Sequence, residues 1–316
     1  MRSSGRALTL APFLIVGLLA IAIALAGVLV TPSVPSDGAA APSPTVSATA
    51  TASAAQTVAP SPVSADPNDS AEMLLRHNAL RDKIGAPALR GDARVIAAAQ
   101  RHALYLAQGG TIGHDEVAGE PGFTGASVRE RLAAQGYPDA TASEVAASAG
   151  SGVEDVSYLW DLPYHRLGLM HPHAVIAGWG HAEIGGHTAT VGVIIFDFAA
   201  RAPNLVKSPA ADQRVSASWH GDESPDVLPG GASRPVGYPI MVVYANAQAV
   251  DLRGGKLSDP NGEAVPFYLV PQLYERDYIA IVPTSPLARG SRYRVRLDLT
   301  VAGSDAVLEW EFATDP

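Results

Sequence analysis

The chain of 316 residues contains no cysteine, so disulfide bonds and thiolate nucleophiles are excluded. Zinc sites built on cysteine, alone or mixed with histidine, are excluded for the same reason. A basic stripe is also lacking, since 22 Lys and Arg stand against 31 Asp and Glu, for a formal net charge of −9. Nucleic acid is bound through clustered positive charge, and we therefore expect no nucleic-acid partner.

The segment 31–68 lacks aromatic residues, Lys and Arg, and is built mainly from Pro, Ala, Ser, Thr and Val. Such a composition buries too little apolar surface to offset the entropy cost of folding. We therefore predict a disordered Pro/Ala/Ser/Thr-rich linker over 31–68. Because proline-rich chains extend by up to ~3.1 Å per residue, the linker would reach on the order of 100 Å.

A long apolar run lies near the N-terminus. Residues 8–30 carry no charge and follow Arg2 and Arg6. As a helix the run covers about 35 Å at ~1.5 Å per residue, enough to cross a ~30 Å hydrocarbon core. We predict a cytoplasmic n-region at 1–7 and a transmembrane helix or signal anchor at 8–30, with the rest of the chain outside the cell. The alternative is a secreted protein, cleaved near Ala26 in a small-x-small sequence.

Helical periodicity begins close to residue 69. Four N-cap candidates precede apolar-periodic segments: Asp69, Asp92, Ser127 and Ser151. Two β-rich runs follow at 175–180 and 188–198, with Gly185-Gly186 between them. Helices followed by paired strands predict an α+β layered domain over 69–200.

From residue 201 onward helical periodicity is absent. Short strand candidates, separated by turn signals such as Asp259-Pro260-Asn261-Gly262, lie at 240–244, 278–282, 293–297 and 308–312. This pattern predicts an all-β sandwich over 201–316.

Several short phrases stand in a fixed order between Ser70 and Phe198: His77-Asn78-Ala79-Leu80-Arg81, Gly113-His114, Glu144, Pro163-Tyr164-His165-Arg166 and Ala177-Gly178-Trp179-Gly180. Together they resemble the CAP superfamily (cysteine-rich secretory protein, antigen 5, pathogenesis-related 1), in its bacterial SCP-like branch. The resemblance implies a three-layer α-β-α sandwich. Two phrases near the C-terminus, Gly237-Tyr238-Pro239-Ile240 and Glu309-Trp310-Glu311-Phe312, resemble bacterial Ig-like domains, which implies an Ig-like sandwich there.

The resemblance also implies a cleft lined by His114, Glu144 and His165. Many CAP members line a central cleft with two His and two acidic residues, which bind zinc in some of them. This chain departs from that pattern, because the second acidic position falls on Pro163 and the usual Asn after the glutamate is Val145. Zinc accepts His nitrogen and carboxylate oxygen at ~2.0–2.2 Å. We predict His114, Glu144 and His165 as ligands of zinc or another divalent cation.

Other polar candidates have simpler interpretations. His102 on an apolar helix face is expected in the core, and Ser143 lacks the nucleophile elbow of a hydrolase. Four further histidines are spaced irregularly, which predicts separate positions: His171, His173, His181 and His187.

Three functions follow from these observations. The preferred one is a non-catalytic surface binding module whose cleft holds a divalent cation, a lipid or a cell-wall ligand. No catalytic residue is assigned, because no general base or nucleophile is separately identifiable. One alternative is a metal-dependent, peptidase-like hydrolase that uses His114, Glu144 and His165. Another is a structural or adhesive protein without a small-molecule site. Expected partners are the membrane, through the N-terminal helix, and the cell wall, a lipid or a surface protein.

Overall fold

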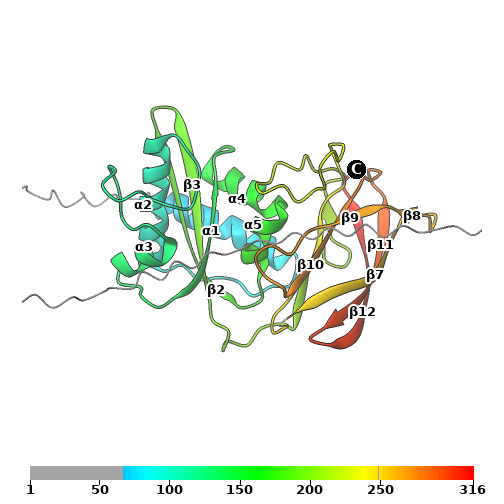
Figure 1. Cartoon of the computed structure of the whole chain (residues 1–316). Helices are drawn as coiled ribbons and strands as arrows, with labels where there is room; N and C mark the ends of the chain where they lie inside the picture. The colour runs from blue at the N-terminus through cyan, green and yellow to red at the C-terminus, as the bar shows by residue number, and fades with distance from the viewer. Residues whose placement is uncertain (1–66, 248) are drawn as a thin grey trace, which may run out of the picture. The chain divides into compact units, whose positions relative to one another are not determined.

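The computed structural model describes residues 67–247 and 249–316 (Figure 1). The predicted n-region and transmembrane helix, and nearly all of the predicted linker, lie outside these residues and stay predictions. Within the described part of the chain, no helix has both the length and the apolarity to cross a membrane.

The described residues form five helices: α1 (Pro67–Asp82), α2 (Ala93–Gly109), α3 (Val128–Ala134), α4 (Gly152–Asp161) and α5 (Pro163–Met170). The predicted N-caps Asp92, Ser127 and Ser151 are confirmed. The predicted N-cap Asp69 is wrong, because α1 already begins at Pro67, and Asp69 lies in its first turn. Proline is preorganised for the start of a helix, which explains why α1 begins at Pro67, two residues before Asp69.

Helix α5 was not predicted as a separate element. Leu162 is extended, with φ −91° and ψ 117°, and separates α4 from α5. Proline disfavours the helical conformation in the residue before it, which explains why Leu162 breaks the helix and Pro163 restarts it. Leu162 has no side chain that could cap α5. The free N–H groups at the start of α5 therefore need a partner from elsewhere.

A three-stranded antiparallel sheet lies among these helices. It consists of β1 (Thr141–Ala147), β2 (Ala174–Ile184) and β3 (His187–Phe196), in the order β1-β3-β2. The predicted hairpin at Gly185-Gly186 is confirmed, with φ of 60° and 84° at the two glycines. Strand β1 was missed by the sequence reasoning. It is an edge strand, and it carries Glu144.

Two glycines of β2 bring α2 directly onto the sheet. A Cβ on Gly178 would lie 2.4 Å from the backbone of Val95, and a Cβ on Gly180 would lie 2.4 Å from the backbone of Gln100. Any side chain at either position would push α2 away from the strand. The Gly178-Trp179-Gly180 phrase is thus a packing device, with Trp179 fully buried between the two glycines.

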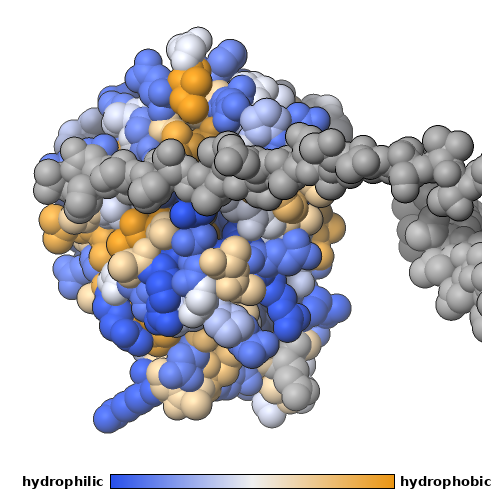
Figure 2. Space-filling model, turned by 90° about the vertical axis from the view of Figure 1, so that its left-hand side faces the viewer, coloured by the Kyte–Doolittle hydropathy of each residue, from blue (hydrophilic) through white to orange (hydrophobic). Residues whose placement is uncertain are grey.

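Helices cover both faces of this sheet. Residues of α2 and α3 form one apolar cluster with Ala146, Ile176 and Val193, whereas residues of α1, α4 and α5 form another with Val145 and Ile194. Strand alternation explains why neighbouring residues such as Val145 and Ala146 belong to different clusters. On the outer side toward α2 and α3, hydrophilic side chains dominate and apolar ones form small groups (Figure 2).

The remaining strands make up the C-terminal β region (residues 205–314). They form two sheets: β4 (Leu205–Ser208), β6 (Ile240–Tyr244), β10 (Tyr278–Pro283) and β9 (Phe267–Leu269) in one, and β5 (Arg214–Val215), β12 (Ser304–Thr314), β11 (Arg292–Val301), β7 (Val250–Ser258) and β8 (Ala264–Val265) in the other. All four predicted strands lie within β6, β10, β11 and β12 and are confirmed.

The sheet β4-β6-β10-β9 is buried on both faces. In β6, Ile240 and Val242 contact the other sheet, whereas Met241 and Val243 join the apolar cluster of α1, α4 and α5. Strand β10 alternates in the same way, and all six of its residues are buried. This sheet is therefore a middle layer between the helices and the outer sheet, and the described residues belong to one compact unit.

Polar contacts reinforce the junction between α5 and the C-terminal β region. The buried guanidinium of Arg166 donates to the carbonyl of Pro239 at 3.0 Å and lies 4.7 Å from the centre of the Tyr238 ring. The Tyr238 hydroxyl donates to Asp161 Oδ1 at 3.0 Å. Burial raises the pKa of Asp161, while the charge of Arg166 acts in the opposite direction. The two parts thus share a polar contact network as well as an apolar core.

A second buried polar group joins α1 to the end of α5. His77 Nε2 donates to the carbonyl of Leu169 at 2.9 Å, and Arg81 donates to the same oxygen at 2.7 Å. Burial lowers the pKa of His77 to about 3, and burial also lowers the pKa of Arg81, to about 10. The imidazole of His77 is therefore neutral in the folded protein at neutral pH.

We predict that acidification from pH 6.5 to pH 5 destabilises the protein through His77. An unfolded chain takes up a proton near the ordinary His pKa of ~6.5, whereas the folded chain does not until about pH 3. The free energy of unfolding then falls by up to ~1.4 kcal/mol per pH unit from this residue alone. Urea titrations at several pH values measure this slope.

The matched variants are His77→Gln, which keeps a donor for Leu169, and His220→Gln, which removes an exposed imidazole. His77→Gln should lower the slope of the free energy of unfolding against pH by the equivalent of nearly one bound proton. His220→Gln should leave this slope near the wild-type value. Equal slopes in wild type and His77→Gln would contradict the assignment.

Candidate functional site

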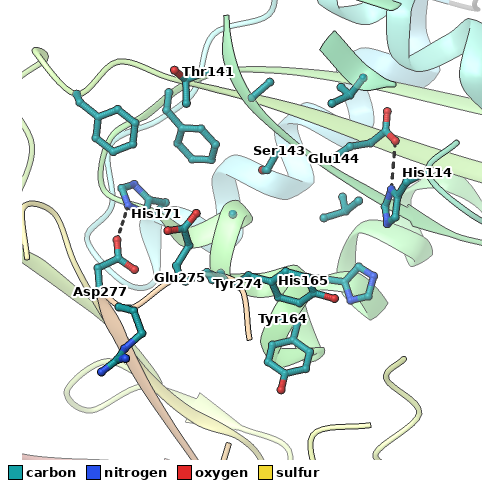
Figure 3. A pocket seen from close by; sticks show the side chains of 18 of the residues that line it. His114, Thr141, Ser143, Glu144, Tyr164, His165, His171, Tyr274, Glu275 and Asp277 are labelled. Atoms are coloured by element: carbon teal, nitrogen blue, oxygen red, sulfur yellow. Dashed lines mark hydrogen bonds and ion pairs between the residues drawn. The ribbon is translucent and has the colours of Figure 1, made fainter. Parts of the chain in front are cut away.

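A cavity of about 890 Å³ lies where α5 and β1 meet the C-terminal β region (Figure 3). Its floor comes from β1 and α5. The end of β3 and two loops, 245–247 and 274–277, complete the wall. His114, Glu144 and His165 all line this cavity, which we call the cleft.

The structure brings His114 and Glu144 together. His114 Nδ1 lies 3.1 Å from Glu144 Oε1, and the His114 side chain is about half exposed, at 54%. His165 lies on α5, and its ring nitrogen Nδ1 pairs with Glu223. Because β1 is an edge strand, the cleft reaches around it, with Glu144 on the α2 and α3 side of the sheet and His165 on the α5 side.

Glu144 is held by a buried arginine. Arg131 Nη2 donates to both carboxylate oxygens of Glu144 at 2.8 Å and to the carbonyl of His114 at 2.9 Å. The side chains of Arg131 and Glu144 are only 1% and 4% exposed. Arg131 therefore balances the charge of Glu144 and fixes the loop that carries His114.

A second acid–base pair lies behind Glu144. His102 Nδ1 faces Glu116 Oε1 at 3.0 Å, and His102 Nε2 faces the carbonyl of Gly113 at 3.2 Å. An imidazole with a proton on each nitrogen satisfies both acceptors. The buried group thus places His102 and Arg131 against two carboxylates, Glu116 and Glu144. His102 thus has the core position that its helix face predicted.

Glu116 is the acceptor that closes the loop from 113 to 126. It receives hydrogen bonds from the backbone N–H groups of Thr124 and Gly125 as well as from His102. Burial alone would raise the pKa of Glu116, but the hydrogen bonds from His102 and Thr124 and the charge of Arg131 outweigh it and lower the pKa. Glu116 is an anion that positions His114, not a group exposed to the cleft.

Glu223 is a site residue that the sequence reasoning missed. Its Oε1 accepts hydrogen bonds from His165 Nδ1 at 2.8 Å and from the backbone N–H groups of Tyr164 and His165 at 2.8 and 3.1 Å. It therefore caps α5, where Leu162 cannot, and fixes the ring of His165. A helix N-terminus favours such a negative charge. The only sequence signal for Glu223 is that Leu162 cannot cap α5, so that the helix needs a capping partner from elsewhere in the chain.

The opposite end of the cleft contains His171, which accepts a hydrogen bond from the backbone N–H of His173 at 3.1 Å and lies 3.2 Å from Asp277. His181 and His187 lie elsewhere: His181 bonds to Thr190, and His187 lies against Gly110. His171 therefore lines the cleft, whereas His181 and His187 lie outside it.

Two of the three predicted metal ligands, Glu144 and His165, are already engaged by other side chains. Within the described residues, no three His, Asp or Glu side chains are grouped so that they could hold one ion. Arg131 already occupies both oxygens of Glu144, and Glu223 occupies Nδ1 of His165. Metal binding at His114, Glu144 and His165 stays a prediction.

Comparison with known proteins identifies the helical part. Residues 74–196 match the family model "CAP: Cysteine-rich secretory protein family". No curated protein matches the sequence.

Solved structures give weaker likenesses. An outer surface protein from Borrelia burgdorferi is 18% identical over 41% of this chain and 93% of its own, with a TM-score of 0.35. An extracellular protein containing an SCP domain from Bacillus anthracis is 18% identical over 41% of each chain, also at 0.35. CopC from Methylosinus trichosporium is 18% identical over 35% of this chain and 89% of its own, at 0.26. Because these TM-scores lie below 0.5, the family-model match alone identifies residues 74–196.

We predict that Glu223→Gln destabilises the protein by about 1–3 kcal/mol, because the amide keeps an acceptor oxygen but removes the buried charge at α5. Chemical denaturation measures the change. Asp222→Asn removes an exposed neighbouring charge and should change the free energy of unfolding by less than about 0.5 kcal/mol. Equal effects of the two substitutions would rule out the capping role of Glu223.

Proposed function

With residues 74–196 forming a CAP domain, we propose that the protein is an extracytoplasmic, non-catalytic binding module that holds a small ligand in its cleft. The observation that carries the proposal is the cavity of about 890 Å³, walled by α5 and β1 on one side and by loops of the C-terminal β region on the other. Its volume lies in the range of ~300–1,000 Å³ that is usual for small-molecule sites.

The lining of the cleft supports binding over catalysis. Three of its ionisable side chains are engaged in structural pairs: Glu144 with Arg131, His165 with Glu223 and His171 with Asp277. Ser143 faces the cleft, but its hydroxyl has no hydrogen-bond partner among the described residues, so no base is placed to activate it. The middle of the cleft is apolar, with Val145, Leu167 and Phe196 in the wall.

The C-terminal β region is part of the proposed site. We assign it the Ig-like sandwich that its phrases resemble. It is then more than a spacer, because Tyr274 and Asp277 line the cleft and Glu223 holds His165.

We predict that the neutral fluorescent probe N-phenyl-1-naphthylamine binds saturably to the cleft. Thr141→Trp places an indole at its rim and should weaken binding about tenfold, equivalent to ~1.4 kcal/mol. Thr111→Trp adds the same ring on an exposed loop outside the cleft and should leave the affinity unchanged. Fluorescence titration gives both constants.

Absence of saturable binding, or equal loss in the two variants, would argue against a ligand cleft and in favour of the adhesive alternative. Peptide hydrolysis that is abolished both by a chelator and by His165→Ala would instead support the metal-dependent hydrolase.

We also propose that residues 8–30 anchor the protein in the membrane, with the linker 31–68 carrying the folded part outward. The apolar length of this run supports an anchor. Cell fractionation should then recover the full chain in the membrane fraction. The protein should also resist extraction from that fraction at high salt. Recovery from the medium with a new N-terminus after Ala26 would show a cleaved signal peptide instead.

A further inference from the structure

At the end of the cleft around His171, two acidic residues, Glu275 and Asp277, lie next to one arginine, Arg276, whose guanidinium pairs with Asp251. Four acids line the cleft: Asp115, Glu144, Glu275 and Asp277. Arg131 balances Glu144, and Arg276, which lines the same end, pairs with Asp251 at 2.8 Å outside the cleft. Within the described residues, neither Glu275 nor Asp115 has a cationic side chain within 4.0 Å. The lining of the cleft therefore holds four carboxylates against one guanidinium, that of Arg276.

The hydrogen bonds of His171 show that it does not neutralise Asp277. The backbone N–H of His173 donates to His171 Nδ1 at 3.1 Å, so this nitrogen carries no proton. The proton lies on Nε2, which donates to Asp277 Oδ2 at 3.2 Å. His171 thus donates one hydrogen bond to Asp277 through Nε2.

The second oxygen of Asp277 has no partner. Oδ1 is buried and accepts no hydrogen bond from the described residues. A buried anionic oxygen without a donor is costly, and a nearby positive charge lowers that cost without a hydrogen bond. In Figure 3 the Asp277 and Glu275 carboxylates lie on the same side of the cleft, next to the ring of His171.

Aromatic rings surround these acids. Phe196 and Phe198 stack with centroids 6.0 Å apart, and each lies within 6 Å of the His171 ring, at 5.3 and 5.7 Å. Tyr274 packs edge-on against Tyr164 at 5.3 Å. Phe198 and Tyr274 are unusually exposed for aromatic residues, at 55% and 61%. Aromatic faces attract organic cations, and more strongly where water is excluded.

We propose that this end of the cleft binds the ammonium group of an amphipathic ligand, whose apolar part lies along β1 and α5. The inference rests on the proposed function and names the ligand class for that site. Carboxylates next to exposed aromatic rings suit a bulky organic cation. The apolar stretch from Val145 to Leu167 suits its hydrocarbon body, and the net charge of −9 favours approach of a cation.

The test uses three probes of equal chain length that compete with N-phenyl-1-naphthylamine on the full chain: decyltrimethylammonium, decyl sulfate and decanol, each below its micelle concentration. The ammonium probe should bind at least about tenfold more tightly than the sulfate. Its affinity should also fall as salt rises, because salt screens the attraction.

The double variant Asp277→Asn/Glu275→Gln removes two charges and keeps an acceptor for His171. It should weaken the ammonium probe about tenfold or more and leave decanol within about twofold. Glu120→Gln removes an exposed charge outside the cleft and is the matched control. Unfolding curves for each variant confirm that the fold is kept.

The outcomes distinguish failure of the cation site from failure of the proposed binding function. Equal affinity for the three probes, or an unchanged ammonium affinity in the double variant, overturns the cation site while leaving a ligand cleft in place. Failure of all three probes and of N-phenyl-1-naphthylamine overturns the binding function itself.

Discussion

The sheet β4-β6-β10-β9 must be covered on both faces, and the rest of the described structure depends on that requirement. Its strands alternate between two apolar cores, so neither face tolerates water. The outer sheet covers one face, and helices of the CAP domain cover the other. Burial of this much apolar surface is the largest favourable contribution to folding. It joins the CAP domain and the C-terminal β region into one compact unit and fixes the loops that border the cleft.

The residues that resemble a metal centre have a different organisation here. His114 and Glu144 are positioned by Arg131, which itself belongs to a buried group of alternating charges. His165 is positioned by Glu223, which comes from a loop after the CAP domain. Each histidine therefore has its own carboxylate. The two histidines are thus fixed by separate acidic partners rather than by one shared centre.

Much of the fold was predictable from local sequence signals. The caps at Asp92, Ser127 and Ser151 and the hairpin at Gly185-Gly186 depend on residues within a few positions of each other, so they could be predicted without knowledge of the tertiary structure. Strand β1 was not predictable, because its Ala-rich sequence has weak strand propensity and only its pairing with β3 makes it extended.

The site was predictable only in part. The phrases around His114, Glu144 and His165 indicated residues that line one cleft, and the structure shows all three in its wall. Glu223 and Asp277 come from loops remote in sequence from the CAP domain, and no periodicity or spacing links them to it. The charge balance of the cleft therefore depends on long-range contacts, which only the folded chain reveals.

The capping of α5 by Glu223 has a consequence for the order in which the protein matures. A chain that is made from its N-terminus presents the CAP sequence first, with the N–H groups of α5 uncapped and the ring of His165 unrestrained. The cleft is completed only after Glu223 and then the loop at Asp277 have emerged. The cleft therefore takes its full shape only in a chain whose synthesis has passed Asp277, and the helical domain alone lacks part of its wall.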